Sequence, residues 1–318
     1  MCTWERSQPI VRAPIALAAS CPDLVATAPH PDLSGRVLGG QYRLLRRLVD
    51  DGGAATYEAE HAQSQRRLIL KVVPPHAAPE QHFFAGAHAA VIVRHEYLID
   101  IIGITDSGCD QQAGEAPVTY LAMEILTGES LATTLAMDGP LRWTRVLSIA
   151  RQICRALVDA SDRGIGHGDI RLDTCFRCSR PDTADFIELL DFRAAAPAAG
   201  ASGDVTHALH HQRAHLHSLG VLMYQLLTGE SPYTGAGGPA DDGATQTPVP
   251  MRRTLPSLEI SPAFEALVLR ALIRDPDECF ADPRVMLAAL MAAEPAASRA
   301  SYLPSNPLSW GAGSLLAP

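Results

Sequence analysis

The sequence contains no apolar run long enough to cross a bilayer and no block of lysine and arginine. A membrane-spanning helix needs about 20 consecutive apolar residues, so we expect no membrane span. The formal net charge of -9 opposes the negative field of nucleic acids and of anionic membranes. The sequence therefore argues against a nucleic-acid partner.

Cysteine is sparse and scattered, with seven residues that show no regular spacing. Small secreted domains usually carry an even, clustered set that forms a disulfide framework. Residues 13–21 are similar to a short signal segment that ends in cysteine, but Pro14 interrupts the apolar run and Glu5 is atypical of a positive leader. We therefore expect a reducing, cytoplasmic location.

The chain is long enough to bury a large core, because 47% of its 318 residues are hydrophobic. Residues 1–38 are rich in alanine, proline and serine without a sustained period, which predicts a flexible N-terminal segment. Residues 296–318 also lack a period and are expected to form a C-terminal tail. The folded part should lie between these segments.

Hydrophobic periodicity divides the folded part into a strand-rich half and a helix-rich half, which predicts an α+β fold. The first half contains one predicted helix, at 80–94, and five predicted strands, at 42–48, 55–61, 68–73, 98–105 and 118–124. After Gly128 the pattern becomes helical, with predicted helices at 131–137, 142–163, 218–228, 262–273 and 283–293.

Two short stretches carry candidate catalytic chemistry, and they are Gly164-Ile-Gly-His-Gly-Asp-Ile-Arg171 and Leu189-Leu-Asp-Phe-Arg193. The first resembles the His-Arg-Asp catalytic loop of protein kinases, and the second resembles their Asp-Phe-Gly turn. Further matching stretches occur in the family's order, and they are Tyr57-Glu-Ala-Glu-His61, Leu70-Lys-Val72, Tyr120-Leu-Ala-Met-Glu124, Ser218-Leu-Gly-Val221, Leu226-Leu-Thr-Gly-Glu-Ser-Pro232 and Leu272-Ile-Arg-Asp-Pro276.

The sequence thus resembles bacterial serine/threonine protein kinases, as a degenerate member similar to a pseudokinase. The resemblance implies a two-lobed kinase-like domain over residues 39–295. Its small lobe of antiparallel strands would cover about 39–124, and its larger, mainly helical lobe would cover about 128–295. A hinge would lie between the lobes, near residues 124–126.

The resemblance also implies roles for individual residues, together with ATP and Mg²⁺ as possible cofactors and a protein as substrate or partner. Asp169 matches the residue that accepts the substrate's proton, and Arg171 replaces the lysine beside the transferred phosphoryl group. Asp191 would hold magnesium, and Thr174 would be a weak second ligand where the family has asparagine. The expected nucleotide-binding residues are Lys71, Gly52, Gly53, Glu124, Leu126 and Asp191.

Structural interpretations of the two most important side chains remain open beside these roles. Lys71 lies in the middle of an apolar strand, where it either grips an anion or extends its charged end to solvent. A pair between Lys71 and Asp191 would close the site without nucleotide. Asp169 is either the catalytic carboxylate or one that only caps its loop.

The loop that covers the phosphates departs from the family pattern. The three glycine positions are Val49, Asp51 and Ala54, although Gly52 and Gly53 still allow a tight turn. Asp50 and Asp51 would direct negative charge toward a polyphosphate. An ordinary hairpin turn explains this stretch as well as a nucleotide-binding loop does.

Other catalytic parts are altered as well. Gly86 stands where the family has the glutamate that pairs with the lysine, and Arg193 replaces the glycine of the Asp-Phe-Gly turn. No glutamate occurs between Asp191 and Glu230, so the Ala-Pro-Glu motif is missing. These changes favour nucleotide binding over catalysis.

The leading hypothesis is therefore a pseudokinase that acts through protein contacts and is gated by nucleotide. The alternative is a weakly active serine/threonine kinase that uses Lys71, Asp169, Arg171 and Asp191.

A second alternative is a metal-responsive module, because five histidines fall within 207–217 and His207, His211 and His215 would share one helical face. The sequence supplies no obvious further ligand. Cys175 and Cys178 form a lone pair where the family resemblance implies a strand, so zinc is disfavoured. The competing interpretation of the histidines is a solvated stretch of chain.

Overall fold

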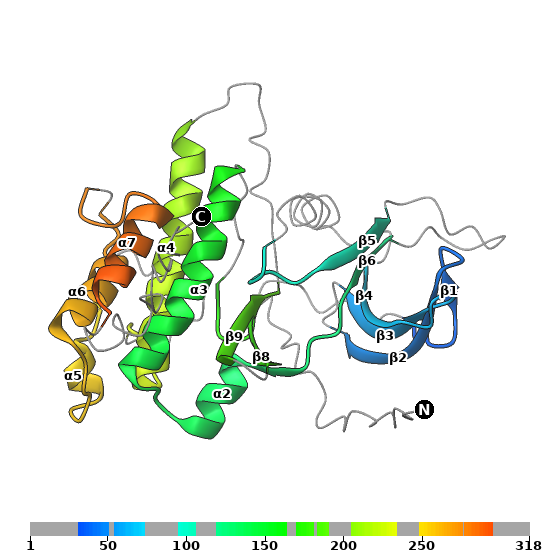
Figure 1. Ribbon diagram of the computed structural model, residues 1–318, viewed down its shortest axis with the longest axis horizontal. Helices are drawn as coiled ribbons and strands as arrows, with labels where there is room; N and C mark the ends of the chain where they lie inside the picture. The colour runs from blue at the N-terminus through cyan, green and yellow to red at the C-terminus, as the bar shows by residue number, and fades with distance from the viewer. Residues whose placement is uncertain are drawn as a thin grey trace, which may run out of the picture.

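The computed structural model describes residues 31–50, 54–73, 95–105, 119–163, 170–180, 183–190, 205–233, 248–275 and 277–294. These residues form a sheet lobe and a helical lobe, which lie at opposite ends of the long axis in Figure 1. The chain therefore has the α+β, two-lobed architecture that its periodicity and its motifs predict. The predicted helix at 80–94 lies outside the described residues, as do 1–30 and 295–318.

The sheet lobe is built on one antiparallel sheet with the strand order β1-β2-β3-β4-β6-β5. Five of its strands were predicted, and the short first strand was not. In chain order the strands are β1 (Val37–Leu38), β2 (Tyr42–Asp50), β3 (Ala55–His61), β4 (Arg67–Val73), β5 (Ile101–Thr105) and β6 (Thr119–Met123).

The two faces of this sheet bury different sets of side chains, because neighbouring residues on a strand point to opposite faces. One face holds a core around Leu44, Tyr57 and Leu70. The other face contributes Ile69 and Met123 to a cluster that also contains residues from outside the sheet lobe. The sheet thus has a core of its own and a second apolar face toward the rest of the molecule.

A smaller antiparallel sheet lies at the junction with the helices. It consists of β7 (Gly128–Ser130), β8 (Cys175–Arg180) and β9 (Thr183–Leu189) in that order. Leu189 donates a backbone hydrogen bond to Tyr97, and Ile99 donates one back to Leu189. This exchange connects the segment that precedes β5 directly to the helical lobe.

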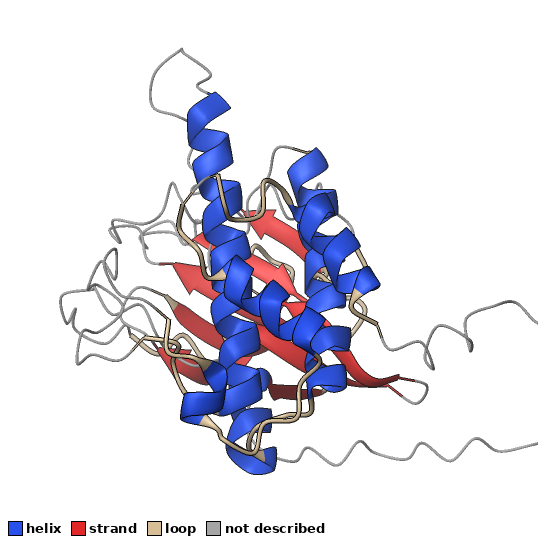
Figure 2. Ribbon diagram, turned by 90° about the vertical axis from the view of Figure 1, so that its left-hand side faces the viewer, coloured by secondary structure: helices blue, strands red, loops and turns tan. Residues whose placement is uncertain are grey.

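In the helical lobe α3 (Trp143–Asp162) packs against two other described helices and against β9, and its buried side includes Ile149, Ile153 and Leu157. Figure 2 looks onto this lobe and shows the helices in front of the strands. The other described helices are α2 (Leu131–Asp138), α4 (Val205–Thr228), α5 (Met251–Thr254), α6 (Pro262–Ala271) and α7 (Pro283–Ala292).

Helix ends follow local capping chemistry. The side chains of Ser130, Ser261 and Asp282 accept backbone N–H groups at the starts of α2, α6 and α7. Proline occupies the first turn of α6 and of α7, where no N–H is needed. These signals explain why the predicted boundaries of α6 and α7 lie within two residues of the observed ones.

The start of α4 was wrongly predicted, because the helix begins at Val205 and not near Ser218. The segment from 205 to 217 contains neither glycine nor proline, so nothing in it interrupts a helix. Leu216 is buried in the main core, so the helix already packs against the lobe before Ser218. The histidine-rich segment is therefore part of a long helix.

Candidate functional site

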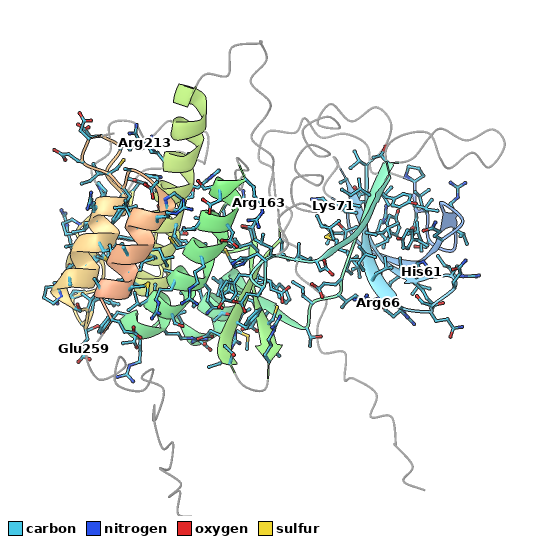
Figure 3. The ribbon with its side chains drawn as sticks, turned by 45° about the horizontal axis from the view of Figure 1, so that its top comes forward. His61, Arg66, Lys71, Arg163, Arg213 and Glu259 are labelled. Carbon is cyan, nitrogen blue, oxygen red and sulfur yellow. The ribbon has the colours of Figure 1, made fainter. Side chains whose placement is uncertain are left out.

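Lys71 lies on the side of the sheet lobe that faces the helices. It occupies β4, in register with Thr56 on β3 and Leu121 on β6. It shares a strand face with Ile69, two residues before it, and Ile69 belongs to the apolar cluster that reaches Leu126 and Leu190. Figure 3 shows Lys71 toward the helical lobe, whereas His61 lies at the far side of the sheet lobe. A cation is thus directed toward the space between the lobes.

The segment 124–126 connects the lobes and is held at its start by a reciprocal pair of hydrogen bonds. The Glu124 backbone N–H donates to the Asp100 carbonyl oxygen at 3.2 Å. In return, the Asp100 N–H donates to Glu124 Oε1 at 2.9 Å. Leu126 is half-buried and packs against apolar clusters of both lobes. These contacts fix the backbone at the position expected to bind a nucleotide base.

Arg171 is held by a carboxylate from its own loop. Its Nε donates to Asp173 Oδ1 at 3.0 Å, and its Nη2 donates to Asp173 Oδ2 at 2.6 Å. The exposed fraction is 31% for the Arg171 side chain and 14% for the Asp173 side chain. Both oxygens of one carboxylate therefore meet the flat fork of one guanidinium, which is the strongest geometry for this pair. The sequence analysis did not identify Asp173.

Thr174 closes the same loop through its hydroxyl group. Its Oγ1 accepts the Arg171 backbone N–H at 2.9 Å and donates to the Arg171 carbonyl oxygen at 3.2 Å. The residue is only 6% exposed. Its carbonyl oxygen accepts the N–H of Leu190 at 2.9 Å, which ties the loop to the residue that precedes Asp191 in the sequence. The hydroxyl group of Thr174 thus holds the backbone of this loop in place through hydrogen bonds.

The hairpin between β2 and β3 is described up to the turn itself. Val49 lies opposite Thr56 in the antiparallel register. The Asp50 carboxylate accepts a hydrogen bond from Arg47 Nη1 at 3.0 Å. We expected Asp50 to direct negative charge toward a polyphosphate, but the ion pair with Arg47 offsets that charge.

Several residues that the sequence singles out lie outside the described residues. They are Gly52, Gly53, Asp169 and Asp191, together with the altered position Gly86. Of the expected site, the structure describes Lys71, Glu124, Leu126, Arg171 and Thr174, but not its two expected acidic centres.

A network of charged groups follows the connecting segment, and no motif in the sequence predicted it. Arg145 Nε and Nη2 donate to the two Asp185 oxygens at 2.8 and 2.9 Å. Arg145 Nη1 donates to Asp138 at 2.8 Å. Arg177 Nη2 donates to Glu129 Oε1 at 2.6 Å, and its Nη1 lies 3.7 Å from Asp185. The network joins α2, α3 and the three strands of the small sheet.

These contacts set the charge state of Glu129, the first acidic residue after the connecting segment. Burial alone would raise its pKa, but hydrogen bonds from Arg177 and from the Thr134 hydroxyl outweigh burial and leave the pKa lowered. Glu129 is therefore ionised and already bound at neutral pH.

Glu188 is a second acidic group near the connecting segment, and it is only 4% exposed. Burial raises its pKa, and the negative charge of Glu124 raises it further. Arg180 opposes this effect with a hydrogen bond of 3.0 Å to Glu188 Oε1. The guanidinium of Arg180 also lies 3.3 Å from the centre of the Phe186 ring, so it is fixed from two sides.

The histidine-rich segment is not a solvated stretch where its side chains are described. His215 is 8% exposed, and His217 Nε2 lies 2.7 Å from the hydroxyl oxygen of Tyr233. The side chains of His207, His210 and His211 lie outside those described. Within the described ranges, no three histidine, cysteine or acidic side chains form a group that could hold a metal ion.

The two cysteines of β8 are inaccessible, since Cys175 is fully buried and Cys178 is 6% exposed. Burial raises the pKa of the Cys178 thiol well above its ordinary value. In the part of the chain that the structure describes, no helix meets the length and apolarity that a bilayer span requires.

Comparison with known sequences finds bacterial serine/threonine-protein kinases among the relatives of this chain. The chain is 33% identical over 302 residues to the serine/threonine-protein kinase Pkn1 of Myxococcus xanthus, covering 83% of this chain and 42% of that protein. It is 27% identical over 310 residues to Pkn3 of the same organism, covering 89% of this chain and 55% of that protein. The chain thus spans about half the length of these curated relatives. No protein-family model matches it.

Solved structures of protein kinases have the same fold as this chain. The kinase domain of Mycobacterium tuberculosis PknI matches with a TM-score of 0.62 and 20% identity, over 83% of this chain and 99% of that domain. Rad53 in complex with AMP-PNP matches with a TM-score of 0.59 and 18% identity, over 74% of this chain and 60% of that one.

Proposed function

Because the chain has the protein-kinase fold and is homologous to bacterial serine/threonine protein kinases, we propose that it is a pseudokinase. In this proposal the cleft between the lobes keeps a nucleotide site, phosphoryl transfer is lost or severely weakened, and the protein acts by contact with another protein. Residues 39–295 would be the folded unit that carries this role.

One observation supports the loss of transfer above the others, and it is the use of the Thr174 hydroxyl group. By family resemblance this position holds an asparagine that binds the second magnesium ion. Here the hydroxyl group accepts from and donates to the backbone of Arg171, and the residue is almost entirely buried. A neutral oxygen that is engaged in this way is a poor ligand for Mg²⁺, which prefers charged and accessible oxygen atoms.

Other residues fit a nucleotide better than they fit catalysis. Lys71 lies on the sheet face that it shares with Ile69, from which it would contact phosphate oxygens. The backbone at Glu124 and Leu126 is held in place and would meet the base. Asp191 would supply one carboxylate for a magnesium ion that keeps most of its waters. Bound Mg-ATP would supply the transferable phosphoryl group, and the residues described here would only bind and orient it.

A weakly active serine/threonine kinase is the second candidate, and the retention of Lys71, Asp169 and Asp191 at the matching positions favours it. Phosphoryl transfer depends mainly on positioning and charge neutralisation. The loss of some of the charged or metal-binding groups therefore lowers the rate of transfer by a measurable factor.

Transfer of radiolabelled phosphate from ATP, to the protein itself and to a general protein substrate, separates the two candidates. The wild type and Asp169→Asn should give the same background signal if the protein is a pseudokinase. Transfer that disappears in Asp169→Asn identifies an active kinase. Thermal melting with ATP, with and without Mg²⁺, tests the nucleotide site independently. The absence of any shift would refute gating by ATP.

A further inference from the structure

A buried carboxylate on β9 has only one of its two oxygens satisfied. Glu188 is 4% exposed, and its Oε1 accepts a hydrogen bond of 3.0 Å from Arg180 Nη2. Its other oxygen, Oε2, is covered by protein atoms and receives no hydrogen bond of normal geometry from the residues that the structure describes. A covered oxygen without a donor is costly while the carboxylate carries its charge, and it costs less when the group is protonated. The surroundings of Glu188 therefore favour its uncharged form.

Two backbone pairings link the strand of Glu188 to the connecting segment. Ile99 donates its N–H to the carbonyl oxygen of Leu189, the residue after Glu188, at 3.1 Å. Asp100, the residue after Ile99, exchanges two hydrogen bonds with Glu124, at 3.2 and 2.9 Å. Glu188 and Glu124 therefore lie on neighbouring parts of the fold, and the charge of Glu124 acts on Glu188.

Three charged or titratable groups of the described residues face Glu188. Burial raises the pKa of Glu188 most and the charge of Glu124 raises it further, whereas Arg180 and the thiol of Cys178 lower it. The side chain of Arg180 is 47% exposed, so solvent screens its charge. The Cys178 thiol is only a weak donor. The repulsion between the two carboxylates is therefore offset only in part.

We propose that Glu188 is a positioning residue that acts through Glu124, and that its uncharged form holds the connecting segment in the conformation that receives the nucleotide base. This inference rests on the proposed nucleotide site. When Glu188 loses its proton, two negative charges oppose each other, and Glu124 relieves the repulsion by releasing the Asp100 N–H. The backbone at 124–126 then loses a bond that fixes its start, so a smaller share of the molecules is ready to bind a base.

Isothermal titration calorimetry of the whole chain at pH 5 and at pH 8 tests the inference. Adenosine is the probe of the base position, and inorganic tripolyphosphate is the probe of the phosphate position. We expect the wild type to bind adenosine about tenfold more weakly at pH 8, because Glu188 is then charged. Glu188→Gln should bind adenosine equally tightly at both pH values, since its amide has no charge and keeps an oxygen that can accept from Arg180.

Glu124→Gln tests the same repulsion from the other side. It removes the charge that opposes Glu188 and keeps an oxygen that can accept the Asp100 N–H, so it should also abolish the difference between the two pH values. Glu129→Gln is the matched control, because Glu129 is a carboxylate bound by an arginine, Arg177, at 2.6 Å shortly after the connecting segment. This control should keep the tenfold difference of the wild type. The affinity for tripolyphosphate should depend on pH in the same way in all four proteins.

The inference is wrong if the wild type binds adenosine equally well at both pH values, or if Glu188→Gln keeps the wild-type difference. It is also wrong if Glu188→Gln changes the affinity for tripolyphosphate as much as the affinity for adenosine. Circular dichroism at both pH values checks that each variant is folded, and Glu124→Gln and the wild type decide if Glu188→Gln is not. Adenosine binding without these differences refutes the role of Glu188 alone, whereas the absence of adenosine binding in every protein refutes the nucleotide site and this inference with it.

Discussion

Stability at mildly acidic pH should depend on His217, which lies in α4. Its Nε2 lies 2.7 Å from the Tyr233 hydroxyl oxygen, and the two rings are stacked with their centres 6.0 Å apart. The Arg274 guanidinium lies over the other ring of this pair, at 6.0 Å from the centre of Tyr233. Burial, and then the positive charge of Arg274, lower the pKa of His217 to about 4.

The size of the effect follows from the two pKa values. The imidazole of an unfolded chain has a pKa of 6.5, so as the pH falls the unfolded state takes up a proton before the folded state does. Above pH 6.5 His217 is neutral in both states and the unfolding free energy is unaffected by it. Below pH 6.5 the unfolding free energy falls, and it stops falling once the pH is below the folded pKa of about 4. Between pH 8 and pH 5 the loss should be about 2 kcal/mol.

Urea unfolding of the wild type and of His217→Phe, at pH 8 and at pH 5, measures this contribution. Phenylalanine keeps an aromatic ring against Tyr233 and cannot be protonated. The wild type should lose about 2 kcal/mol more unfolding free energy between the two pH values than the variant does. The contributions of His95, whose pKa burial also lowers, and of the carboxyl groups are common to both proteins and cancel. An equal loss in both proteins would refute the reasoning.

Three further substitutions test the packing of the helical lobe and of the small sheet by thermal and urea unfolding. Gly128→Ala should cost about 2 kcal/mol or more, because a Cβ there would lie 1.9 Å from the Arg177 carbonyl oxygen and the residue has a φ of 150°. Asp185→Ala should cost about 3 kcal/mol, because it leaves Arg145 without its bidentate partner. Ile153→Ala should cost about 3 kcal/mol through the cavity that it opens in the fully buried side of α3, whereas a change of less than about 1 kcal/mol would contradict this packing.

Local signals in the sequence were enough to predict most elements of the fold. The apolar run around Lys71 predicted β4 because strands buried on both faces have nearly continuous hydrophobic sequences. Proline after Ser261 and after Asp282 marked the starts of α6 and α7. These features depend only on a few neighbouring residues, so a single sequence contains them.

Features that depend on distant residues could not be predicted in this way. The three residues of β7 form a strand only because β8 pairs with them, and no period can be detected over so short a stretch. Arg145 and Asp185 are 40 residues apart and meet only when α3 packs against β9. Nothing in the composition of either segment signals that contact.

In the candidate site, too, some features follow from the sequence and others depend on contacts that only the folded structure reveals. Strand alternation predicts that Lys71 shares a sheet face with Ile69, and family resemblance marked Arg171 and Thr174. Asp173 escaped notice because an acidic residue in a loop is common and its role depends on the rotamer of Arg171. The hydroxyl group of Thr174 was expected to be a weak metal ligand. Its hydrogen bonds to the loop backbone depend on the folded conformation of the loop and could not be predicted from the sequence.

Phosphate transfer from ATP by the full chain, followed over several hours beside Asp169→Asn, is the most direct test of the pseudokinase proposal. The proposal predicts that both proteins incorporate the same background amount of label, with and without Mg²⁺. Incorporation that grows with time in the wild type, requires Mg²⁺ and is absent from Asp169→Asn would contradict it.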